Sequence, residues 1–166
     1  MNGVSLELLE TQTKSSQVRV RSEAVADGYF PVPNEEKLGR GFFVPDDLLQ
    51  KSGEEFRIVG RTSDVINVAG KKVNPAEVEA ILLRHEGVRQ AVVFGRESAS
   101  RNQEVAACVV ALCDVKESQL LEFCRRRLSS WQVPKQILLV AEIPVTERGK
   151  ISRRDLARAF PVRSVS

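Results

Sequence analysis

Two runs rich in valine and alanine, residues 88–94 and 104–112, place the strongest restriction on how this chain folds. Runs of this length and composition are typical of buried β-strands. A third strand is predicted at 136–140, directly after Pro134. Stretches of helical spacing lie before, between and after these runs. We therefore predict an α+β fold: a small sheet of about three strands with a two-stranded hairpin, packed by helices.

The hairpin is predicted from two short apolar segments, 56–59 and 65–68, with turn residues at 69–72. Two helices in the second half of the chain are predicted from apolar stripes at helical spacing. They span residues 117–128 and about 152–160.

A third helix has a clear start signal. Asn74 is a suitable N-cap, Pro75 suits the first helical position, and Glu77 completes a capping box. The apolar face continues through His85, and Gly87 is a natural stop. This start signal predicts a helix that follows the hairpin directly.

The first part of the chain alternates apolar and polar residues at 4–9 and 17–21, which predicts two half-buried strands joined by a polar loop at 11–16. A few short strands without a covering layer are rarely stable alone. We therefore expect residues 1–60 to be the β-rich tail of a larger N-terminal domain, and residues 61–166 to form a C-terminal domain.

The charge distribution argues against a general nucleic-acid binder. The net charge is only +3, and the basic residues gather locally, at 125–127 and around Lys150. This pattern favours a local anionic ligand over a long polyanion. No apolar run approaches the roughly 18 residues of a membrane span, and the N-terminus lacks the layout of a secretory signal, so we expect a cytoplasmic protein.

Neither cysteine nor histidine predicts a metal site. Cys108, Cys113 and Cys124 are an odd number without metal-ligand spacing, and we expect buried, reduced thiols. His85 is the only histidine in the chain, so we predict neither a histidine-based metal site nor a Ser-His-Asp triad.

The segment 143–156, IPVTERGKISRRDL, carries the strongest chemical signal. Pro144 precedes a loop, Gly149 gives the backbone freedom, and Lys150 projects a flexible positive charge just before the last helix. An ammonium group on a flexible stem is well suited to meet developing negative charge. An ordinary surface lysine is the alternative reading of Gly-Lys taken alone.

This segment resembles the last signature of the adenylate-forming superfamily, Pro-x-Thr-x-x-Gly-Lys-(Ile/Val)-x-Arg-(Arg/Lys)-x-Leu, found in acyl-CoA synthetases, peptide-synthetase adenylation domains and luciferases. The lead-in Trp131-Gln132-Val133-Pro134 is similar to that family's Tyr-x-Val-Pro. The stretch 60–79, GRTSDVINVAGKKVNPAEVE, resembles its Gly-Arg-x-x-Asp hinge, glycine loop and Pro-x-Glu-(Val/Ile)-Glu helix.

The resemblance implies a role for each matched residue. Lys150 is the catalytic lysine of a mobile C-terminal domain, and Arg61 contacts the nucleotide. Ser63 stands at the hinge, where the family usually has Asp or Lys. Gly70 and Lys71 belong to the loop that serves coenzyme A or a pantetheine arm, with a plain hairpin turn as the alternative reading.

A weaker match surrounds Asp47, which falls where the family holds the ribose hydroxyls of ATP with a carboxylate. Pro45 and Asp46 replace the usual Thr-Gly before it. The phosphate loop and the Tyr-Gly-x-Thr-Glu segment of the family are not found in this sequence.

The resemblance therefore implies the C-terminal part of an AMP-forming acyl-CoA synthetase, which uses ATP with Mg²⁺, a carboxylic acid and coenzyme A. It implies a missing N-terminal adenylation domain as partner, with no substrate bound to this part alone and no activity without the large domain. Two alternatives stay open: an adenylation domain that loads a carrier protein, and a non-catalytic module that keeps the fold.

Overall fold

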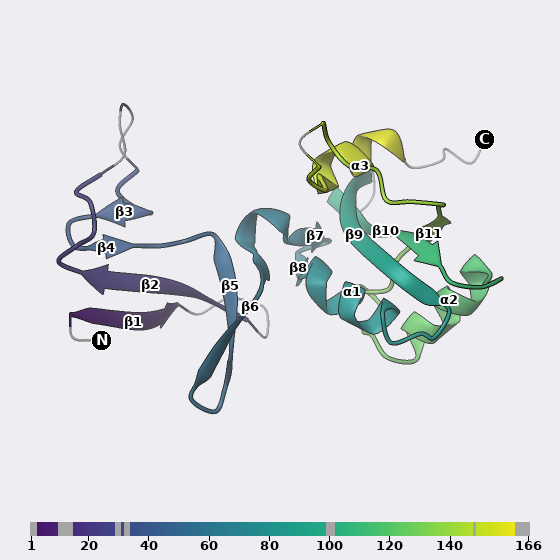
Figure 1. Cartoon of the computed structure of the whole chain (residues 1–166), viewed down its shortest axis with the longest axis horizontal. Coiled ribbons are helices and arrows are strands. Elements are labelled where there is room, and N and C mark those ends of the chain that lie inside the picture. The colour runs from purple at the N-terminus through teal and green to yellow at the C-terminus, as the bar shows by residue number, and fades with distance from the viewer. Residues whose placement is uncertain are drawn as a thin grey trace. The chain divides into compact units, whose positions relative to one another are not determined.

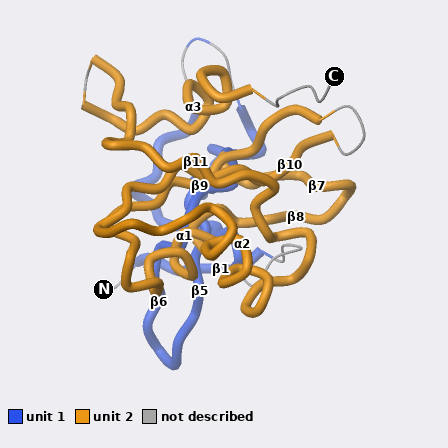
Figure 2. The backbone as a smooth tube through the Cα atoms, turned by 90° about the vertical axis from the view of Figure 1, so that its right-hand side faces the viewer, with its two compact units in different colours: residues 1–63 blue, residues 64–166 orange. Residues whose placement is uncertain are grey.

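A computed structural model describes residues 3–9, 15–28, 31, 34–98, 102–147 and 149–161 (Figure 1). The chain forms two compact units, residues 1–63 and residues 64–166 (Figure 2).

Unit 1 is a single antiparallel sheet. Its strands are β1 (Val4–Leu9), β2 (Ser16–Ser22), β3 (Leu38–Gly39), β4 (Phe42–Phe43), β5 (Asp47–Ser52) and β6 (Glu55–Arg61). They run in the order β3-β4-β2-β5-β6, and β1 pairs with β2 along its length. The two strands expected near residues 4–9 and 17–21 are therefore present, whereas β3, β4 and β5 were not anticipated. The predicted polar loop between β1 and β2 includes residues outside the described part of the chain.

Unit 1 buries few apolar side chains. Among its described residues the buried hydrophobic ones are Val18, Leu38, Val44 and Leu48. By contrast, the apolar residues of β1, namely Val4, Leu6 and Leu8, are 42–51% exposed, and Ile58 on β6 is 70% exposed. A sheet with this much uncovered apolar surface needs a further covering layer to bury it.

Unit 2 is an α+β domain, which confirms the predicted fold class. Its elements are β7 (Ile66–Val68), β8 (Lys71–Val73), α1 (Pro75–Leu82), β9 (Val88–Ser98), β10 (Asn102–Ala111), α2 (Glu117–Arg125), β11 (Gln136–Leu139) and α3 (Arg153–Ala159). The 3₁₀ turn η1 (Thr62–Asp64) lies at the junction of the two units. The sheet order is β11-β10-β7-β8. In addition, β9 pairs with β10 along the length of β10. β11 runs parallel to β10, and the other pairs are antiparallel.

The central strand β10 is buried on both faces, because its side chains alternate between two hydrophobic cores. Val105, Ala107 and Val109 belong to the core under α1 and α2. Ala106 and Cys108 belong to the core under α3, together with Leu156 of that helix. Figure 1 shows α3 on one side of the β9–β10 ribbon and α1 and α2 on the other.

The hairpin is built from different strands than the sequence predicted. Residues 56–59 lie in β6 and pair with β5 in unit 1, while β7 pairs with β8. Lys71 and Lys72, which were expected in the turn, are strand residues, and the turn consists of Ala69 and Gly70 alone. Both turn residues have positive φ, +49° and +84°, as a tight two-residue hairpin turn of the primed type requires.

Helix α1 starts where the sequence indicated and ends earlier. The Asn74 side chain accepts a hydrogen bond from the Ala76 N–H, which confirms the predicted N-cap. The helix ends at Leu82, so placing His85 in its last turn was wrong. Residues after Leu82 form tighter turns instead, and His85 Nδ1 accepts a hydrogen bond from Gly87 N–H at 3.1 Å.

Candidate functional site

The loop before α3 holds Lys150 by its backbone and leaves its side chain exposed. The Thr146 N–H donates to the Lys150 carbonyl at 2.8 Å, and the Lys150 N–H donates to the Thr146 hydroxyl oxygen at 3.2 Å. Gly149, at φ +69°, donates to the Thr146 carbonyl. None of the ion pairs within the described residues involves Lys150, so its backbone is held while its exposed side chain is open to a ligand.

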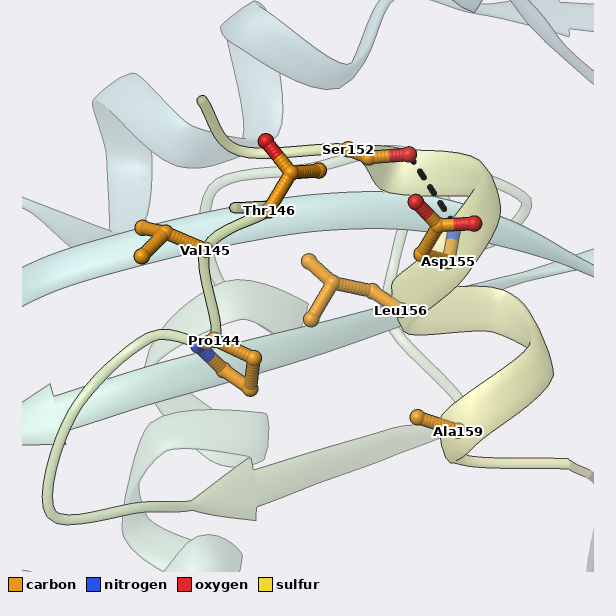
Figure 3. A pocket seen from close by; sticks show the side chains of 7 residues that line it. All are labelled: Pro144, Val145, Thr146, Ser152, Asp155, Leu156 and Ala159. Carbon is orange, nitrogen blue, oxygen red and sulfur yellow. Dashed lines mark hydrogen bonds between the residues drawn. The ribbon is translucent and has the colours of Figure 1, made fainter. Parts of the chain in front are cut away.

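A small pocket lies between this loop and α3 (Figure 3). It is lined by Pro144, Val145, Thr146, Ser152, Asp155, Leu156 and Ala159. Its volume is about 140 Å³, well below the roughly 300–1,000 Å³ of typical ligand pockets. The pocket alone therefore does not enclose a nucleotide, and Lys150 is not one of the residues that line it.

Helix α3 is anchored by Arg153, three residues after Lys150. Its guanidinium group donates to Asp64 Oδ2 at 2.8 Å, to Glu79 Oε1 at 2.9 Å and to the Val93 carbonyl at 2.9 Å. The Val93 N–H in turn donates to the same Glu79 oxygen. One side chain thus ties the start of α3 to α1, β9 and the turn η1. Each of the three guanidinium nitrogen atoms of Arg153 thus has an acceptor within unit 2.

The two predicted nucleotide residues lie side by side in unit 1. Asp47 begins β5, Arg61 ends β6, and the two are opposite each other in the sheet register. Arg61 Nε lies 3.4 Å from Asp47 Oδ1. The Arg61 side chain is 67% exposed and the Asp47 side chain 34%, so both can still meet a ligand from solvent.

Asp46, the residue that departs from the family pattern, has partners of its own. Its Oδ1 accepts from Lys37 Nζ at 2.6 Å and from the Thr62 hydroxyl at 3.2 Å, and its carbonyl accepts from the Thr62 N–H at 2.7 Å. The hydrogen bond from Lys37 is the main reason that the pKa of Asp46 lies below its usual value. The unusual Pro45-Asp46 pair therefore leaves Asp47 at its strand position.

The Gly70 turn presents an open surface. Its N–H donates to Asn67 Oδ1 at 3.0 Å, and a Cβ added at Gly70 would meet nothing within 4 Å. Within unit 2 the glycine is required by its φ of +84° and not by crowding. Beside the turn, Lys71 Nζ lies 5.7 Å from the ring centre of Trp131, which is 41% exposed.

The cysteines depart in part from the expectation that all are buried. Cys108 and Cys124 are buried, and burial raises the pKa of each thiol to about 11. Cys113 is exposed, because it follows the end of β10 in the loop before α2. All three are free thiols.

The described residues contain neither a cluster of metal ligands nor a membrane-spanning helix. No group of three or more His, Cys, Asp or Glu side chains there is placed to hold a metal ion. No helix in the described ranges is long and apolar enough to cross a membrane.

Comparison with known proteins identifies the family. Residues 77–150 match the model of the AMP-binding enzyme C-terminal domain. A probable CoA ligase of Humulus lupulus is 33% identical over 151 residues, which cover 88% of this chain and 29% of the relative. The chain belongs to the adenylate-forming ligases and carries their C-terminal domain.

Two further proteins of this family match different shares of the chain. A 3,4-dihydroxybenzoate–aryl-carrier protein ligase of Bacillus anthracis is 42% identical over 108 residues, 65% of this chain and 26% of the relative. The structure of ATP-bound MatB from Rhodopseudomonas palustris matches 96% of this chain and 34% of its own, at 25% identity and a TM-score of 0.81. This chain thus spans about 30% of the length of the ligases it resembles.

Two interactions of this ligase domain escaped the sequence reasoning. The acceptors of Arg153, Asp64 and Glu79, lie 89 and 74 residues before it in sequence. No family motif predicts the Lys37–Asp46 ion pair either, because the family pattern has glycine at the position of Asp46. The only sequence signal was the departure at Asp46 itself.

Proposed function

We propose that this chain is the C-terminal part of an AMP-forming acyl-CoA synthetase. The parent enzyme joins a carboxylic acid to ATP, used with Mg²⁺, to give an acyl-adenylate and pyrophosphate. It then transfers the acyl group to the thiol of coenzyme A. The observation that carries the proposal is the Lys150 loop, which fixes the backbone of the lysine through Thr146 and leaves its side chain exposed, without an ion pair to any residue that the structure describes.

Lys150 supports the first half-reaction in this proposal. A preorganised cation stabilises charge where it develops, here at the carboxylate and the α-phosphate. Asp47 holds the ribose hydroxyls, since an ionised carboxylate only accepts hydrogen bonds, and Arg61 contacts the same nucleotide. The pocket beside Lys150 is too small for a nucleotide, so the remaining walls come from a large N-terminal adenylation domain. The exposed apolar residues of β1 fit a sheet that packs against such a domain.

The second half-reaction uses another part of unit 2. The Ala69-Gly70 turn presents no side chain beyond Cβ, and Lys71 beside it supplies a positive charge. These features suit the passage of a pantetheine arm next to an anionic group. Coenzyme A is the proposed acceptor. A carrier protein is the second candidate, favoured by the 42% identity to a ligase named for an aryl-carrier protein.

The test is pyrophosphate release by the full-length ligase, or by this chain combined with a separately produced large domain, across a panel of fatty and aromatic acids. Lys150→Ala should lower the adenylation rate by about 10²- to 10³-fold, as the loss of one preorganised charge-stabilising group does. Lys135→Ala is the matched control, because Lys135 is also exposed but lies next to β11.

Two results would contradict the proposal. Adenylation by Lys150→Ala at the wild-type rate would remove the lysine from the reaction. Pyrophosphate release with none of the acids would favour the non-catalytic alternative. The acceptor is settled by offering coenzyme A and a phosphopantetheinylated carrier protein to the same enzyme and following thioester formation by mass spectrometry.

A further inference from the structure

The boundary between the two compact units falls between Ser63 and Asp64. Ser63 is exposed, and its side chain makes none of the hydrogen bonds found among the described residues. The residues on either side of it are strongly bonded, each to its own unit. Within the segment 62–64, the first and last residues are therefore each bonded to one unit, and Ser63 lies between them.

Thr62, on the N-terminal side, is held by Asp46. The Thr62 N–H donates to the Asp46 carbonyl at 2.7 Å, and the Thr62 hydroxyl donates to Asp46 Oδ1 at 3.2 Å. Lys37 Nζ donates to the same carboxylate oxygen at 2.6 Å and fixes the orientation of the Asp46 side chain. All three residues belong to unit 1.

Asp64, on the C-terminal side, is held by Arg153. Arg153 Nη1 donates to Asp64 Oδ2 at 2.8 Å, Nη2 donates to Glu79 at 2.9 Å, and Nε donates to the Val93 carbonyl. Three bonds from one planar guanidinium group leave it little freedom, and a charge-assisted bond of this kind is among the stronger ones in proteins. These residues all belong to unit 2.

We propose that Asp46 and Arg153 are positioning residues that confine the hinge to Ser63, one by fixing Thr62 to unit 1 and the other by fixing Asp64 to unit 2. Rotation between the units then uses the two backbone torsions of a single residue. A short, defined hinge restricts the orientations that unit 2 can take, which favours a few discrete poses over a broad range.

The Asp46 half of this arrangement depends on a residue particular to this chain. The family pattern has glycine at that position, and glycine has no carboxylate to accept the Thr62 hydroxyl. The Arg153 half also links the hinge to the reacting end of unit 2, because Arg153 is in the first turn of the helix that follows Lys150. The inference rests on the proposed function, in which two different parts of unit 2 serve the two half-reactions, but its test requires no enzymatic activity.

The experiment uses the full-length ligase in which only the 166 residues of this sequence carry ¹⁵N, so that unit 1 keeps the covering layer proposed for it. Residual dipolar couplings give one alignment tensor for each unit, and heteronuclear NOE values report order at each backbone N–H. In the wild type, the Thr62 coupling should fit the tensor of unit 1 and the Asp64 coupling that of unit 2. Asp46→Ala keeps the bond from the Thr62 N–H to the carbonyl of residue 46 but removes the carboxylate that Lys37 orients, so the Thr62 coupling should fit the tensor of unit 1 less well. Arg153→Ala should release Asp64, seen as a lost fit and a lower NOE.

Matched variants separate this role from general destabilisation. Asp46→Asn keeps a side-chain oxygen for the Thr62 hydroxyl and should restore the Thr62 fit. Glu54→Ala and Arg154→Ala remove exposed charges of the same sign from the same units and should leave residues 62–64 unchanged. Couplings of the other residues in each unit show that the variant is folded.

The proposal is overturned if Thr62 or Asp64 fits neither tensor in the wild type, or if Asp46→Ala and Arg153→Ala leave both fits intact. If one alanine variant loses all structure, the conservative variants carry the test. Asp46→Asn should keep the Thr62 fit, and Arg153→Lys should release Asp64 in part. A ligase without adenylation activity would contradict the proposed function and leave these couplings as they are, so the two failures are distinguishable.

Discussion

Thr146 and Lys150 bond each other in both directions, from the Thr146 N–H to the Lys150 carbonyl and from the Lys150 N–H to the Thr146 hydroxyl oxygen. The second bond depends on the side chain of Thr146. This side chain also lines the pocket beside α3 (Figure 3). The position of the lysine backbone is therefore set partly by a residue that needs no contact with the substrate.

Thr146→Val tests this relationship. Valine keeps the shape of threonine but offers no acceptor to the Lys150 N–H. Because the site is exposed, water replaces the lost bond and the free energy of unfolding should fall by less than about 1 kcal/mol. The adenylation rate of the full-length ligase should fall about tenfold, since small errors in the placement of a catalytic group are costly. Pyrophosphate release measures the rate.

Thr146→Ser is the control, because it retains the hydroxyl oxygen and should stay within about threefold of the wild type. Wild-type adenylation by Thr146→Val, alongside an impaired Lys150→Ala, would show that the threonine hydroxyl does not position the lysine.

The sequence predicted this loop and its lysine because the information is local. Pro144, Gly149 and the cap residue Ser152 lie within a few positions of Lys150, and Ser152 does accept a hydrogen bond from the Asp155 N–H. The same is true of the Asn74 cap and of the apolar strand runs, which β9 and β10 contain. Their local physics is strong enough to fix these elements without the rest of the chain.

The strand at 56–59 was assigned to the wrong hairpin because β5 was not predicted, although β5 and β6 are neighbours in sequence and are joined by a turn at Gly53-Glu54. Other missed features depend on distant partners. The bonds of Arg153 to Asp64, Glu79 and Val93 follow only from how the sheet and helices meet. The roles of Lys150, Asp47, Arg61, Ser63 and Gly70 in the reaction stay predictions.

Substitutions at Gly70 separate the requirement of the turn from that of the acceptor. Gly70→Ala should lower the free energy of unfolding by about 1 kcal/mol, because φ is +84°, whereas Gly70→Asn should cost only a few tenths, since asparagine tolerates this conformation. Neither Cβ meets an atom of unit 2. Urea unfolding of the chain measures both changes.

In the full-length ligase, Gly70→Asn should keep adenylation and lose thioester formation, because its side chain fills the space proposed for the pantetheine arm. Normal thioester formation by this folded variant would show that the turn is only structural. Asn67→Asp is a useful companion variant, since it keeps the acceptor for the Gly70 N–H and leaves the space open.

The thiols should differ sharply in reactivity. Burial raises the pKa of Cys108 and Cys124 to about 11, so at about pH 8 roughly one in a thousand of these groups is a thiolate, and burial also blocks reagents. Brief treatment of the native chain with iodoacetamide should modify Cys113 alone, as seen by mass spectrometry. In urea all three should react. Native labelling that persists in Cys113→Ser would contradict the burial of the other two.

The Lys37–Asp46 pair predicts a specific acid response in unit 1. Because the hydrogen bond from Lys37 lowers the pKa of Asp46 in the folded chain, the stability that it contributes is present above the unfolded value of 3.8 and is lost as the pH falls through the lowered value. Both side chains are more than 40% exposed, so the contribution is at most about 1 kcal/mol. Lys37→Met should therefore destabilise β5 and β6 at about pH 7, and this difference from the wild type should shrink as the pH falls below 3.8 and through the lowered pKa of Asp46. Hydrogen exchange at the amides of these two strands measures it, with Arg40→Met as an exposed control. A difference that grows in acid would have the wrong sign for this pair and would remove Lys37 as the cause of the lowered pKa.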